Sequence, residues 1–130
     1  MIDTLEQADI RDVWDEIKHG LERTKEKSNA TWRIEDVYAA CLVGKAFLYV
    51  GEPGFVIVQP KEDLITGEPE LLVWIAFSRE HHSVERFQTA VDNLGKDHGF
   101  RKLVMQSSRP GWDKNPGWTA VSVNYERVLP

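Results

Sequence analysis

The stretch Leu71-Leu72-Val73-Trp74-Ile75-Ala76-Phe77 decides the fold of this 130-residue chain. An unbroken apolar run of this length is typical of a β-strand that is buried on both faces. A helix is predicted next over residues 80–97, because apolar side chains recur there every three or four positions. A second apolar run at 103–107 predicts another strand. Strand, helix and strand in this order predict a βαβ unit whose two strands are parallel.

The segments before this unit predict two helices and a hairpin. Residues 9–26 place apolar side chains on one helical face, and a second helix is expected from a Thr31 cap to Gly44. Strands at 47–50 and 55–59 are joined by Gly51-Glu52-Pro53-Gly54, which suits a tight turn. Alternating side chains from Val121 to Tyr125 predict a last, half-buried strand. The expected fold class is therefore α/β (α+β), with one domain over 1–130, a mixed twisted sheet and helices on both faces.

The composition narrows the classes of function. A net charge of −5 with scattered basic residues argues against general nucleic-acid binding. The single cysteine, Cys41, excludes an internal disulfide, and its apolar neighbours indicate a small core residue rather than a nucleophile. No apolar run is long enough to cross a membrane, and the acidic start does not resemble a signal peptide. We therefore expect a protein that is not secreted by a signal peptide and has no membrane partner.

Several segments carry a resemblance to a known family. They are residues 42–50, 71–77, 99–105, the turn Arg109-Pro110-Gly111-Trp112 and the closing residues 125–129. In order and spacing the chain resembles the GNAT N-acetyltransferase fold, and it is most similar to the small divergent GNAT-like proteins of tailed bacteriophages. The resemblance implies a location in the host cytoplasm or in the phage virion.

The resemblance also implies where coenzyme A would bind. In GNAT enzymes a glycine-rich loop after the central strand holds the pyrophosphate on backbone N–H groups. The matching residues 78–85 contain no glycine, and Glu80 and Glu85 would oppose an anionic ligand. The candidate cofactor-binding residues are Arg79, His81, His82 and Ser83. The candidate catalytic residues are Glu70, as base, and Asp113, which stands where the family often has a tyrosine.

Two further groups of residues have competing interpretations. His81 and His82 are adjacent, so on a helix they point about 100° apart and form a poor metal site; exposed polar residues are the simpler interpretation, and no metal is expected. Trp112 and Trp118 lie in a turn rich in proline and glycine, where each could close one end of the core. Alternatively, Arg109, Trp112 and Trp118 form a surface that binds another protein, phage or host, or a second copy of the chain.

Taken together, the residues lead to two hypotheses of function. The first is a catalytically degenerate phage-type protein that acts through protein contacts, as a virion component, assembly factor or host-directed effector, and needs no cofactor. It predicts no measurable binding of acetyl-CoA at sub-millimolar concentration. The alternative is an acyl-CoA-dependent N-acetyltransferase with an altered cofactor loop. The missing glycines and tyrosine favour the first hypothesis.

Overall fold

A computed structural model describes residues 4–28, 30–79, 84–106, 114–115, 117–121 and 125–130. Within them the chain forms three helices and five strands. In chain order these elements are β1 (Glu6–Gln7), α1 (Ile10–Ser28), α2 (Ile34–Leu42), β2 (Phe47–Gly51), β3 (Gly54–Glu62), β4 (Pro69–Ser78), α3 (Val84–Asp97) and β5 (Leu103–Val104).

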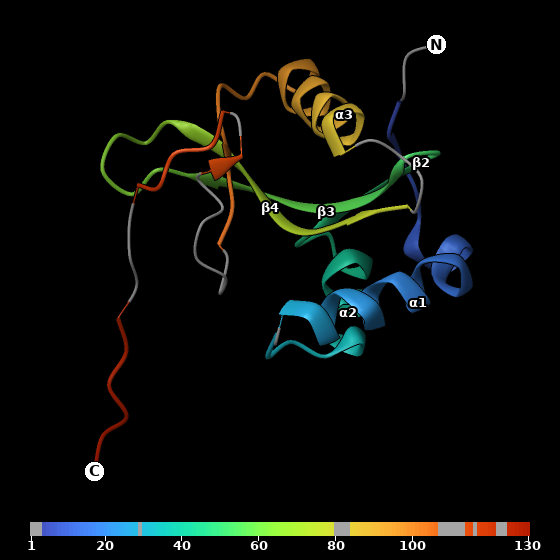
Figure 1. Cartoon of the computed structure of the whole chain (residues 1–130), viewed down its shortest axis with the longest axis horizontal. Helices are drawn as coiled ribbons and strands as arrows, with labels where there is room; N and C mark the ends of the chain where they lie inside the picture. The colour runs from blue at the N-terminus through green and yellow to red at the C-terminus, as the bar shows by residue number, and fades with distance from the viewer. Residues whose placement is uncertain (1–3, 29, 80–83, 107–113, 116, 122–124) are drawn as a thin grey trace.

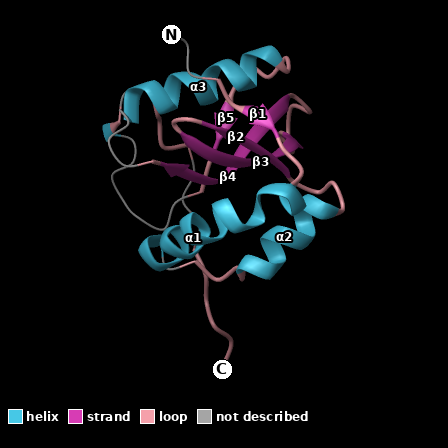
Figure 2. Cartoon of the chain, turned by 90° about the vertical axis from the view of Figure 1, so that its right-hand side faces the viewer, coloured by secondary structure: helices cyan, strands magenta, loops and turns pink. Residues whose placement is uncertain are grey.

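One mixed sheet connects all five strands in the order β1-β2-β3-β4-β5. The pairs β1–β2, β2–β3 and β3–β4 are antiparallel, whereas β4 and β5 are parallel. In the chain, α3 connects β4 to β5. α3 covers one face of the sheet, and α1 and α2 cover the other (Figures 1 and 2). The predicted fold class, the βαβ unit and the helices on both faces are confirmed. No helix in the described ranges has the length and apolar character needed to cross a membrane.

A β-bulge in β4 sets which side chains face which layer. On β3, Ile57 pairs with Ile75 and Val58 pairs with Val73, so Trp74 is an extra residue without a partner on β3. The bulge reverses the alternation of side chains along the strand. Leu71 and Val73 therefore pack towards α3, whereas Ile75 packs towards α1 and α2.

The two faces of the sheet carry separate apolar cores. Towards α1 and α2, the buried residues are Ile10, Ile17, Leu21, Val37, Ala46, Leu48, Phe55, Ile57 and Ile75. Towards α3, they are Tyr49, Val56, Val58, Leu71, Val73, Phe87, Val91 and Leu94. The apolar stripes predicted for the helices at residues 9–26 and 80–97 are confirmed, because the buried side chains of α1 and α3 lie in these cores. In β4, Leu71, Leu72, Val73 and Ile75 are buried, as expected for a continuous apolar run, whereas Ala76 is exposed.

The first two helices begin with local polar contacts. The Asp9 carboxylate accepts a hydrogen bond of 2.9 Å from the backbone N–H of Arg11 and pairs with the Arg11 guanidinium at 2.6 Å. α2 begins after Arg33 rather than after Thr31. There the Asp36 carboxylate accepts a 3.0 Å bond from the backbone N–H of Arg33. This contact stands in place of the cap predicted at Thr31.

The structure differs from the sequence-based expectations in three further places. The helix predicted up to Gly44 ends at Leu42 instead, and the Leu42 side chain is about half exposed. Trp74, expected to be fully buried, is only half-buried because the bulge displaces it from the regular ladder. The described residues around the predicted last strand form no strand, and Val121 and Tyr125 are exposed. Alternation alone cannot form a strand without a partner edge.

We predict that Ile75→Ala destabilises the protein by about 2–5 kcal/mol, because this side chain is 2% exposed inside a packed core. Denaturant unfolding would measure the change. Ala76→Ser is the matched control, since Ala76 is its exposed neighbour on β4, and should change stability by no more than about 0.5 kcal/mol. Equal effects of the two substitutions would contradict the assignment of faces made by the bulge.

A second prediction concerns the start of α1. The side-chain and backbone hydrogen bonds from Arg11 lower the pKa of Asp9 from 3.8 to about 2. A lowered folded-state pKa means that this contact stabilises the fold fully above about pH 4 and is lost as pH falls towards 2. An NMR titration of the Asp9 carboxyl should give that midpoint, and Arg11→Gln should return it towards 3.8. A midpoint near 3.8 in the unmodified protein would show that the contact does not persist in solution.

Candidate functional site

β4 and β5 pair over only two residues and then separate. Leu71 pairs with Leu103 and Leu72 with Val104, and no described residue pairs with β4 on this side beyond Leu72. β4 nevertheless continues to Ser78, four residues beyond the bulge at Trp74. Among the described residues, the edge of β4 over residues 73–78 is therefore unpaired, and we call this segment the β4 opening. Peptide groups on such an edge can hydrogen-bond an extended ligand that carries amides.

The carboxyl end of β4 is held in place by the hairpin of β2 and β3. The backbone N–H of Arg79 donates a 2.9 Å hydrogen bond to the carbonyl of Pro53 in the hairpin turn. Gly54 starts β3 with φ +151°, and a Cβ there would lie 2.0 Å from the Phe77 carbonyl oxygen. The Arg79 side chain is exposed, and the Ser78 hydroxyl is buried with no hydrogen-bond partner among the described residues. Both residues come just before α3 in the chain.

The predicted base Glu70 lies at the other end of β4. Nine residues separate it from Arg79, which is about 30 Å of extended strand. The Glu70 carboxylate lies 3.8 Å from the Lys102 ammonium, which is also 3.9 Å from Asp63. Glu70 is therefore closer to the narrow end of the β4 opening, at Leu72, than to Arg79. The structure does not bring the two predicted residues together.

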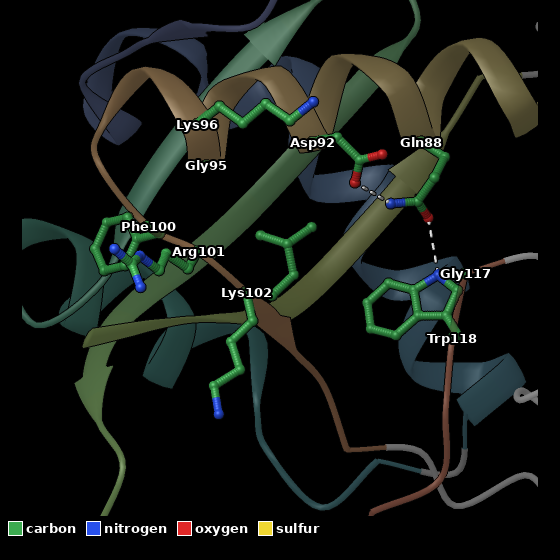
Figure 3. A pocket seen from close by; sticks show the side chains of 10 residues that line it. Gln88, Asp92, Gly95, Lys96, Phe100, Arg101, Lys102, Gly117 and Trp118 are labelled. Atoms are coloured by element: carbon green, nitrogen blue, oxygen red, sulfur yellow. Dashed lines mark hydrogen bonds between the residues drawn. The ribbon is translucent and has the colours of Figure 1, made fainter. Parts of the chain in front are cut away.

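A pocket of about 290 Å³ lies between α3, β5 and the segment around Trp118 (Figure 3). We call it the α3–β5 pocket. Trp118 is half-buried, and its indole N–H donates a 3.1 Å hydrogen bond to the Gln88 side-chain oxygen. The Gln88 amide in turn donates a 2.9 Å bond to Asp92. Sequence reasoning singled out Trp118 but missed its partners on α3, although Gln88, Asp92 and Lys96 recur at helical spacing of four.

Several predicted site residues lie outside the described residues. These are His81, His82, Ser83, Arg109, Trp112 and Asp113. Their proposed roles, and the contact surface that would join Arg109 and Trp112 to Trp118, stay predictions. Within the described part of the chain, no group of three or more His, Cys, Asp or Glu side chains is arranged to hold a metal ion.

Cys41 lies on α2 and packs against the core that faces α1 and α2. Burial raises the pKa of its thiol from 9.0 to about 11. A raised pKa keeps the sulfur protonated at neutral pH, and a protonated thiol is a poor nucleophile. The environment of Cys41 thus agrees with a core residue.

The architecture resembles solved acetyltransferases over nearly the whole chain. A ribosomal-protein-alanine N-acetyltransferase from Brucella melitensis biovar Abortus 2308 superposes with a TM-score of 0.69 at 14% identity, over 99% of this chain and 100% of that one. An aminoglycoside acetyltransferase from an uncultured soil metagenomic sample, in complex with sisomicin, gives 0.64 at 13% identity, over 99% and 97% of the two chains. No family model and no curated protein sequence matches this sequence. The chain has a GNAT-like fold.

These likenesses correct the first hypothesis of function. The prediction of a catalytically degenerate protein that acts through protein contacts is wrong, because the structural neighbours are acetyltransferases and favour the alternative. The prediction gave too much weight to one loop without glycine. The composition of that loop does not reveal the bulge in β4 or the short pairing between β4 and β5.

We predict that Cys41 reacts slowly with iodoacetamide in the folded protein. With a pKa of about 11, only about one thiol in a thousand is ionised at pH 8. Mass spectrometry should show alkylation that speeds up as pH rises towards 11 and that becomes much faster in denaturant. Rapid alkylation of the folded protein at pH 7 would identify Cys41 as an activated thiol and contradict this assignment.

Proposed function

We propose that the protein is an acyl-CoA-dependent N-acetyltransferase, which transfers an acetyl group from acetyl-CoA to an amine. The observation that carries the proposal is the β4 opening, where six residues of a central strand continue beyond the pairing with β5. The likeness to acetyltransferases supports it through the fold. The tailed-phage origin, by contrast, gains no support from the comparisons and stays a prediction of the resemblance.

The residues of the β4 opening fit acetyl-CoA. Its pantetheine arm carries two amides, which match an unpaired strand edge from Val73 to Ser78. The Ser78 hydroxyl, buried without a described partner, is available to a polar group of the ligand. The exposed Arg79 guanidinium at the end of the strand suits a phosphate. The bound cofactor would supply an activated acetyl group on a thioester sulfur.

The chain's own residues then have four tasks. The strand edge orients the ligand, and the apolar side chains of Trp74 and Phe77 restrict water on the face towards α1 and α2. An attacking amine must be neutral, so a group of the chain or a water must accept its proton. Glu70 is our candidate for this base, acting through water from the narrow end of the opening. Asp113 remains the candidate for the group that returns a proton to the thiolate.

Charge should make the cofactor site weak. Glu80 and Glu85 both stand near the start of α3, where the helix dipole attracts an anion. Their carboxylates offset that attraction, while Arg79 and the two histidines add donors. We therefore expect an affinity in the high micromolar range rather than none.

We predict that calorimetry detects acetyl-CoA binding below 1 mM, and that Arg79→Ala weakens it about tenfold through the loss of one charge-assisted hydrogen bond. Arg127→Ala, which removes an exposed arginine from the C-terminal segment, is the matched control and should leave the affinity unchanged. Acetylation of primary amines, followed by the release of free thiol, would test the chemistry. Absence of binding at 1 mM acetyl-CoA would contradict the proposal.

Deletion of Trp74 tests whether the bulge is needed for acetyl-CoA binding at the β4 opening while the fold is retained. Without the bulge residue, Val73 and Ile75 become neighbours in a regular ladder, and each keeps its present face of the sheet. We expect the variant to retain its circular dichroism spectrum, with reduced stability, and to lose acetyl-CoA binding. Undiminished binding would show that the bulge does not shape the site.

A further inference from the structure

The α3–β5 pocket has features of a second ligand site. Its apolar walls are Phe100, Leu103 and the indole of Trp118, and α3 closes it on one side (Figure 3). A volume of about 290 Å³ is near the lower end of the range of small-molecule sites. Gly95 and Gly117 also line it and contribute no side chain that could fill the space. The pocket can therefore accept a small, flat group.

The aromatic wall is held in a defined position before any ligand binds. Trp118 is tied to Gln88, and Gln88 is tied to Asp92 on the next turn of α3. Each bond uses a side chain on a regular helix, so the ring is positioned by a rigid element. A wall that is already ordered costs less entropy when a ligand packs against it.

The charges at the pocket favour an anion. Lys96, Arg101 and Lys102 line it with exposed cationic side chains, against a single carboxylate on Asp92. That carboxylate already accepts the hydrogen bond from Gln88. The Lys102 ammonium lies 3.8 Å from the Glu70 carboxylate and 3.9 Å from the Asp63 carboxylate. Lys96 and Arg101 are therefore the main donors for an anionic ligand. This excess of positive charge occurs in a chain whose net charge is −5.

The cationic end of the pocket is distant from the proposed cofactor phosphates. Those phosphates would lie near the start of α3, at Val84, whereas Lys96 is twelve residues further along, about 18 Å of helix. Gly95, which precedes Lys96 on α3, also lies against Leu103, and Leu103 belongs to the paired part of β4 and β5. A ligand held at Lys96 and Arg101 would therefore be separate from acetyl-CoA.

We propose that the α3–β5 pocket binds a small aromatic anion, with a flat ring against the indole of Trp118 and a carboxylate or phosphate attracted by the exposed cationic side chains of Lys96 and Arg101 (Figure 3). This site goes beyond the proposed transfer reaction and does not depend on it. The ring gains from apolar burial and stacking on the indole. The anionic group gains from charge-assisted hydrogen bonds, strongest with the planar fork of Arg101.

NMR titration of the full-length ¹⁵N-labelled protein tests the site with four probes: benzoate, phenyl phosphate, benzyl alcohol and benzylamine. We expect millimolar or tighter binding of one or both anions, with shifts at the Trp118 indole N–H and at Gly95. A preference for benzoate or for phenyl phosphate identifies the anionic group. Benzyl alcohol and benzylamine should bind at least tenfold more weakly. Equal binding of the alcohol or the amine, or no shift with any probe at 10 mM, would overturn the proposal.

Two variants locate the anion within the pocket. The double substitution Lys96→Gln and Arg101→Gln should weaken benzoate or phenyl phosphate at least tenfold. The charge-matched control, Lys18→Gln with Arg127→Gln, changes exposed residues on α1 and in the C-terminal segment and should have no effect. Acetyl-CoA added to the benzoate complex should leave the Gly95 shift in place. Displacement of benzoate by acetyl-CoA would show that the pocket is part of the cofactor site and would contradict the proposal of a separate site. This conclusion would hold whether or not the protein transfers acetyl groups.

Discussion

The extra residue in β4 is the constraint on which the rest of this structure depends. A regular strand from Leu71 to Phe77 would place Leu71, Val73, Ile75 and Phe77 on one face. The bulge at Trp74 instead sends Ile75 and Phe77 to the layer of α1 and α2, while Leu71 and Val73 remain under α3. As a result, side chains from the single apolar run 71–77 contribute to both cores. A bulge also increases the local twist of a strand.

The same geometry separates two regions that could hold ligands. Beyond Leu72 no described residue pairs with this edge of β4, which ends before Arg79, and such an edge suits a long ligand with amides and phosphates. Beside the paired residues, the polar side of α3 and the indole of Trp118 enclose a smaller pocket with cationic residues around it. The two regions lie along the same helix but offer different chemistry. One presents peptide groups, and the other an aromatic wall with guanidinium and ammonium groups.

Electrostatics explains why the loop before α3 is a poor guide to function. Glycine permits close approach of the backbone to a phosphate, but the peptide N–H groups at the start of a helix are present whatever the side chains. On the proposed function, Glu80 and Glu85 would reduce the affinity for an anion without removing the site. Contacts between the edge of β4 and the pantetheine arm would be independent of the charge on the loop.

Hydrophobic periodicity was sufficient to predict the α/β (α+β) class, the βαβ unit, the β2–β3 hairpin and the inward stripes of α1 and α3, because these features follow from which side chains avoid water. The sequence also identified Arg79 and Trp118 as residues to examine. It could not reveal the bulge, since Trp74 suits a regular strand equally well and only the pairing with β3 makes it an extra residue. Likewise, tertiary structure alone decided that Glu70 lies beside Lys102 and that Trp118 meets Gln88, because both contacts depend on where separate segments pack.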